Sequence, residues 1–168
     1  MTERVTNGLV YVAGALVFAS ATVHLSLGIA GLLDPAVLGV GTVTLPILFL
    51  LAALLAYGLI GAYLTNRVDP RTAYSIGAAL MVAYVLAYVD WHVLQVAEST
   101  LPLDAVGLEH DHSHGHDSHD SHHSHGHDDS VATVLLEHLR EDPTAIVSKT
   151  AESVAALIFI VLAMLERR

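Results

Sequence analysis

Four long apolar stretches restrict what this chain of 168 residues can fold into. A helix needs about 20 mostly apolar residues to cross the hydrocarbon core of a bilayer, and each stretch reaches that length. Inside lipid the backbone polar groups must be satisfied within the segment, so such stretches fold as helices. Composition agrees, because 54% of the residues are hydrophobic and only 14% are charged. The predicted spanning helices cover approximately residues 9–32, 44–64, 72–97 and 145–165.

These stretches predict an all-α integral membrane four-helix bundle. Asp69 and Asp142 each precede a proline, and aspartate followed by proline is typical of a helix start. The first stretch is much longer than the 7–15 apolar residues of a signal peptide, so we expect it to be retained as a helix. Small residues such as Gly28 in the first helix and Gly58 in the second favour close contacts between helices.

A polar segment rich in histidine separates the third and fourth helices. Nine of the 12 histidines lie between residues 110 and 127, where the hexapeptide HSHGHD occurs twice. The tract has too little apolar surface to offset the entropy of ordering, so we expect a disordered loop. A short amphipathic helix on the membrane surface is predicted after it. The predicted divisions are helices one to three (1–97), the acidic histidine-rich loop (98–130), the surface helix (131–142) and the fourth helix (143–168).

The side chains of this loop are candidate ligands for divalent transition metals. Imidazole binds zinc, nickel, cobalt and copper(II), and the absence of cysteine excludes thiolate sites. A solvated spacer is the alternative, since interspersed imidazoles bind metals even without a metal-related function. The candidate loop ligands are His110, His112, His114, His116, His119, His122, His123, His125 and His127, with Asp111, Asp117, Asp120 and Asp128.

The stretch HDHSHGHDSH at residues 110–119 resembles the histidine-rich loops of known metal transporters. Similar loops occur in zinc transporters of the ZIP and cation diffusion facilitator families, and in nickel and cobalt permeases. The resemblance implies a role in membrane metal traffic. The helical part departs from those families, because it lacks an HNxxD-type zinc motif and has fewer spanning helices. Their transport mechanism is therefore not carried over.

Basic residues at or near the ends of the apolar stretches orient the helices. Basic residues favour the cytoplasmic side, which predicts a plasma membrane protein with both termini cytoplasmic and the histidine-rich loop extracytoplasmic. A net charge of −10 makes nucleic acid an unsuitable partner. The basic residues expected inside are Arg4, Arg67, Arg71, Arg167 and Arg168, against Arg140 and Lys149 outside.

Four ionisable residues inside the predicted helices are candidate metal ligands: His24, Asp90, His92 and Glu152. Such residues are costly in lipid unless they face protein or water. At 1.5 Å per residue, His24, His92 and Glu152 lie roughly 12, 8 and 14 Å below the outer helix ends. These three are predicted to form one site beneath the loop. Asp90 and His92 point about 200° apart, so Asp90 would face another helix, although the reverse assignment stays open.

Each of these residues also has another interpretation. His24 could be a hydrogen-bonded packing residue, and Glu152 could pair with Lys149 three residues earlier. His24 and His92 lie on helices that are diagonal neighbours in many four-helix bundles, so a b-type haem of an electron-transfer subunit is an alternative cofactor. A structural membrane protein with an incidental histidine repeat is a third possibility.

Motifs of enzymatic chemistry are missing from the sequence. It contains no glycine-rich phosphate loop, Ser/His/Asp constellation or HExxH helix, so we do not expect an enzyme. The favoured hypothesis is that the loop captures metal ions, which an intramembrane site then transfers or senses. The protein would be a transporter or an accessory subunit of one. Its expected partners are the lipid bilayer and metal ions, with a second copy or a larger permease as further partners.

Overall fold

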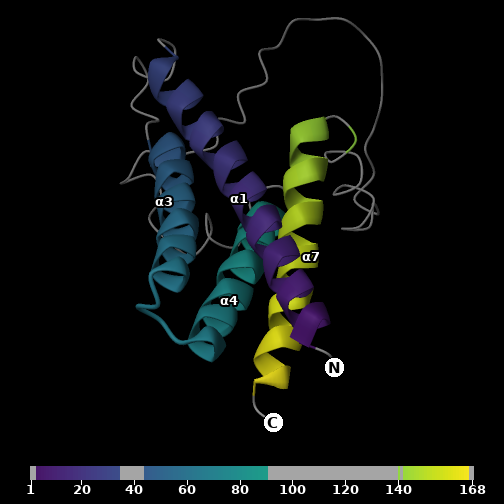
Figure 1. Ribbon diagram of the computed structural model, residues 1–168. Coiled ribbons are helices and arrows are strands. Elements are labelled where there is room, and N and C mark those ends of the chain that lie inside the picture. The colour runs from purple at the N-terminus through teal and green to yellow at the C-terminus, as the bar shows by residue number, and fades with distance from the viewer. Residues whose placement is uncertain (1–2, 35–43, 91–139, 141, 167–168) are drawn as a thin grey trace, which may run out of the picture.

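Four helices make up the described part of the chain (Figure 1). A computed structural model describes residues 3–34, 44–90, 140 and 142–166. Each helix is long and apolar enough to cross a membrane, which confirms the predicted all-α class and its four apolar helices. The predicted loop 98–130 and most of the predicted surface helix 131–142 lie outside the described residues. The helices are α1 (Glu3–Leu33), α3 (Thr44–Leu64), α4 (Pro70–Val89) and α7 (Pro143–Leu165).

The predicted helix starts at the two aspartate–proline pairs are confirmed. The Asp69 carboxylate accepts a hydrogen bond from the backbone N–H of Thr72 at 3.0 Å. Asp142 accepts from the N–H groups of Thr144 and Ala145 at 2.8 and 3.1 Å. Hydrogen bonds from Thr72, chiefly from its side chain, hold the pKa of Asp69 below its ordinary value. Local sequence therefore determines where α4 and α7 begin.

The helices run alternately up and down (Figure 1). We call the end that holds both termini and the α3–α4 turn the terminal end, and the opposite end, with Leu33, Thr44, Val89 and Pro143, the loop end. α1 packs along α3 and α7, while α4 packs along α7 and contacts α3. Both ends of the undescribed segment 91–139 therefore join the bundle at the loop end. The predicted topology and the side of the membrane that the histidine-rich loop faces stay predictions.

Alanine is the commonest buried residue of this bundle, and many large aliphatic side chains point outward. Leu54, Leu86 and Leu157 are each at least 60% exposed. Exposing such a surface to water would be unfavourable, whereas contact with lipid tails carries no such cost. Helices in lipid associate through small residues, which allow their backbones to approach closely. This pattern is compatible with a multi-pass membrane protein. The buried alanines are Ala13, Ala21, Ala53, Ala56, Ala73, Ala145, Ala151, Ala155 and Ala156.

Gly28 allows the close approach of α1 and α3. A methyl group at this position would lie 2.7 Å from Leu50 Cγ and 2.9 Å from the carbonyl oxygen of Pro46, which cannot move unless α3 moves. We expect Gly28→Ala to lower the free energy of unfolding by about 1–3 kcal/mol, measured by denaturant titration in detergent micelles.

Gly58→Ala in α3 is the matched control for this prediction. Among the described residues, no atom outside the neighbouring backbone of α3 lies within 4 Å of a methyl group placed at Gly58. The close contact with another helix that was predicted for Gly58 is therefore wrong for a single copy of the chain. Because alanine favours a helix over glycine, Gly58→Ala should leave the stability unchanged or raise it by up to about 1 kcal/mol. Equal losses in the two variants would contradict the inferred contact at Gly28.

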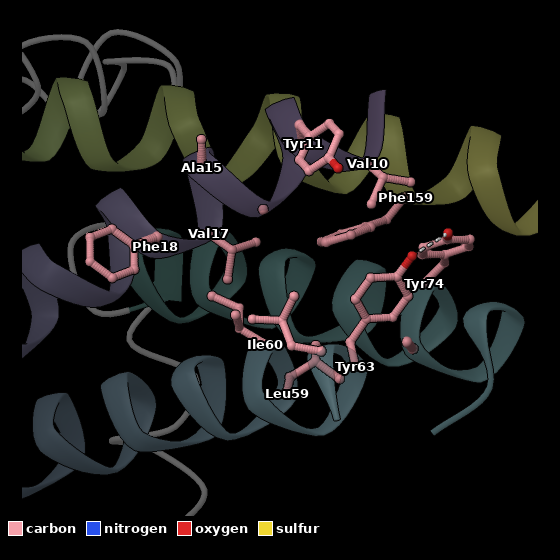
Figure 2. Close-up of a pocket in the computed structure, with 13 residues that line it drawn as sticks. Val10, Tyr11, Ala15, Val17, Phe18, Leu59, Ile60, Tyr63, Tyr74 and Phe159 are labelled. Carbon is pink, nitrogen blue, oxygen red and sulfur yellow. Dashed lines mark hydrogen bonds between the residues drawn. The ribbon is translucent and has the colours of Figure 1, made fainter. Parts of the chain in front are cut away.

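An apolar cavity of about 290 Å³ lies between α1 and α3 toward the terminal end (Figure 2). The hydroxyl groups of Tyr63 and Tyr74 are 3.2 Å apart and form a hydrogen bond at its edge. Phe159 reaches into it from α7, with its ring 6.3 Å from that of Tyr74. No carboxylate, imidazole or basic side chain is among the described residues that line it. This cavity is therefore not a candidate cation site.

Candidate cation site

Glu152 on α7 is a carboxylate buried in the centre of the bundle, with 0% of the residue exposed. Its Oε1 accepts hydrogen bonds from the hydroxyl groups of Ser20 at 2.7 Å and Ser148 at 2.8 Å. Its Oε2 accepts from the Lys149 ammonium group at 2.6 Å. A charge buried away from water is strongly unfavourable unless it is paired and hydrogen-bonded, and these three donors meet that need. Because Ser20 belongs to α1, the carboxylate also links α1 to α7.

His24 on α1 directs one ring nitrogen toward this carboxylate. Its Nδ1 lies 2.9 Å from the backbone carbonyl oxygen of Ser20, which can only accept, so Nδ1 carries the hydrogen. In the neutral ring the lone pair is therefore on Nε2, which lies 3.8 Å from Glu152 Oε1. The rings of Phe49 and Tyr84 flank the imidazole, with centroids 5.6 and 4.9 Å away. A hydrogen bond from the other ring nitrogen is how proteins orient metal-binding histidines.

Lys149 forms the ion pair with Glu152 that the sequence suggested as an alternative to a metal site. Its side chain is only 15% exposed. Its Nζ also lies 3.5 Å from the carbonyl oxygen of Tyr84 and 5.3 Å from the centroid of the Tyr88 ring. The ammonium group is thus held between a carboxylate on its own helix and polar or aromatic groups on α4.

A cavity of about 420 Å³ extends from His24, Ser148 and Lys149 to the loop end of the bundle. All four helices contribute to its wall. His24, Ser148 and Lys149 line its inner part, and Asp142, at the start of α7, lines it at the loop end. The remaining lining residues are Val23, Leu27, Leu45, Leu48, Phe49, Ala52, Tyr84, Ala87, Tyr88, Thr144 and Ala145. A small cation entering from the loop end would therefore meet His24 and Lys149, whereas Glu152, which lies beside both, does not itself line the cavity.

Two of the four predicted intramembrane residues come together. His24 and Glu152 lie at the same depth and in contact, as their helical offsets predicted. Asp90 caps the C-terminal end of α4 and is not among the cavity-lining residues. His92 and the thirteen candidate loop ligands from His110 to Asp128 lie outside the described residues. Within the described ranges no group of three or more His, Cys, Asp or Glu side chains is placed to hold a metal ion.

Two serines of the site, Ser20 and Ser148, were not predicted from the sequence. Ser20 lies four residues before His24, and Ser148 lies four residues before Glu152. A spacing of four places two side chains on the same face of a helix, one turn apart. A polar residue one turn from a buried ionisable group was therefore the signal that could have identified both serines.

Comparisons with protein-family models, with curated proteins and with solved structures find no match to this chain. No family membership follows for the helical part. Function is therefore inferred from the residues of the cavity and from the histidine tract.

Proposed function

We propose that this protein is a multi-pass membrane protein that handles divalent transition metal ions. The histidine-rich loop 98–130 captures the ion outside the cell, and His24 with Glu152 receives it for transfer or sensing. The protein acts as a transporter or as an accessory subunit of one, either as a homo-oligomer or within a larger permease. The proposed location is the plasma membrane, with both termini cytoplasmic.

The convergence of His24 and Glu152 is the observation that carries this proposal. Their ligand atoms come from the first and last helices and lie 3.8 Å apart. Two ligand atoms that are each about 2.1 Å from one ion are separated by at most about 4.2 Å, so this pair can share an ion. Nitrogen and oxygen ligands suit zinc, nickel, cobalt and copper(II). Water, His92 or loop histidines would complete the coordination.

The position of the cavity supports delivery from the histidine tract. The lining of the cavity extends from Lys149 to Asp142, which lies at the end of the bundle where segment 91–139 is attached. The imidazoles between residues 110 and 127 would raise the local concentration of metal ions near the cavity. Capture and delivery would then take place on one side of the membrane.

Cobalt uptake into liposomes tests this proposal. We compare the parent chain, His24→Ala, a chain lacking residues 110–127, and Ser153→Ala as a control on the exposed face of α7. The tract deletion should slow uptake mainly at low cobalt concentration, whereas His24→Ala should lower it by about tenfold or more at every concentration, because a ligand is lost. Ser153→Ala should match the parent.

Three outcomes separate the alternatives. Equal uptake by all four chains would contradict a metal role and favour a structural membrane protein. Cobalt binding that depends on His24 but is not followed by uptake would identify the accessory form of the proposal. A Soret band in the purified protein would instead support the haem alternative.

A further inference from the structure

Lys149 is bound to Oε2 of Glu152, on the same carboxylate whose Oε1 is proposed to bind the ion with His24. Its Nζ lies 2.6 Å from Oε2, so a positive charge already neutralises the carboxylate. The side chain lines the same cavity that leads to the loop end. A divalent ion arriving at Glu152 would therefore be repelled by this ammonium group unless the group moved away.

The wall of the cavity offers the ammonium group a second resting place. The Tyr84 carbonyl oxygen and the Tyr88 ring already lie 3.5 Å and 5.3 Å from Nζ. A carbonyl oxygen accepts hydrogen bonds from ammonium, and the face of a tyrosine ring attracts cations. The lysine side chain is a flexible four-carbon stem, so Nζ can leave Oε2 and keep these partners.

We propose that Lys149 is a tethered competitor for the metal ion. Without metal its ammonium group holds Glu152, and a divalent ion displaces that group onto the wall formed by Tyr84 and Tyr88. Return of the ammonium group promotes release of the ion, which a transfer site needs because an ion bound too tightly cannot leave. This inference rests on the proposed function, since it assumes that Glu152 accepts the metal.

The single lysine of the chain makes the displacement directly observable. We use the full-length protein with the nine histidines between residues 110 and 127 replaced by serine, and lysine labelled with ¹³C at Cε. Adding Zn²⁺ should shift the single lysine signal in this chain. The shift should disappear in Glu152→Gln and persist in Glu166→Gln, which makes the same change in an exposed residue at the terminal end of α7.

Affinity for Co²⁺, followed by its visible absorption, is the second measurement. In the same background, Lys149→Met should bind Co²⁺ at least about tenfold more tightly, because the competing charge is gone. Lys149→Arg keeps the charge and should bind no more tightly than the chain with Lys149. Should Lys149→Met fail to fold, the lysine signal decides alone.

The outcomes distinguish this inference from the proposed function. Co²⁺ binding without any zinc-induced change in the lysine signal would overturn the competitor role and leave the metal site intact. Absence of Co²⁺ binding both in the chain with Lys149 and in a folded Lys149→Met variant would overturn the proposed metal site itself.

Discussion

Lys149→Met is expected to lower the free energy of unfolding by about 3–5 kcal/mol, because it leaves a buried carboxylate without a counter-charge. Glu152 is 0% exposed, so solvent does not screen its charge. The hydroxyl groups of Ser20 and Ser148 would remain as donors, but neither carries a charge. Unfolding by a denaturing detergent in mixed micelles measures the loss.

Glu152→Gln should cost much less than Lys149→Met. Glutamine keeps an oxygen for the serine hydroxyls, and the long Lys149 side chain can extend along the cavity toward the loop end. The double variant Lys149→Met/Glu152→Gln should therefore be close in stability to Glu152→Gln alone. If Lys149→Met were no more costly than Glu152→Gln, Lys149 would not be the cation that compensates the buried charge.

The second large effect concerns metal affinity. With the nine histidines between residues 110 and 127 replaced by serine, Glu152→Gln is expected to weaken Co²⁺ binding by at least about a hundredfold. A neutral amide cannot offset the charge of the ion, and changes even to residues that only orient metal ligands cost 10–100-fold in affinity. The change in the visible absorption of Co²⁺ on titration measures this loss.

Glu166→Gln is the control for this measurement, since the structure places Glu166 as the exposed C-cap of α7. It should bind Co²⁺ as the unsubstituted background does. Unchanged affinity in Glu152→Gln would show that the metal binds elsewhere. The rank order of variants should thus reverse between two measurements: Lys149→Met loses more stability and gains affinity, while Glu152→Gln loses affinity and little stability.

The number of helices, their approximate limits and two of their starts were predictable from the sequence. Length and apolarity are properties of a contiguous segment, and an aspartate before a proline acts within one turn, so neither depends on the rest of the fold. The sequence also singled out His24 and Glu152, because an ionisable side chain in an apolar helix is rare for energetic reasons. Their shared depth followed from the constant rise of a helix.

The tertiary structure alone decided which faces of the helices meet. These helices are apolar on nearly every side, and lipid accepts any apolar face, so hydrophobicity does not choose their rotation. At Gly28, close packing against Leu50 and Pro46 determines which face of α1 meets α3. Gly58 has no such contact among the described residues. The same packing brought Ser20 to Glu152 and held the Lys149 ammonium group beside α4. A sequence specifies which groups need partners in lipid, whereas the partners themselves are chosen by how the helices pack.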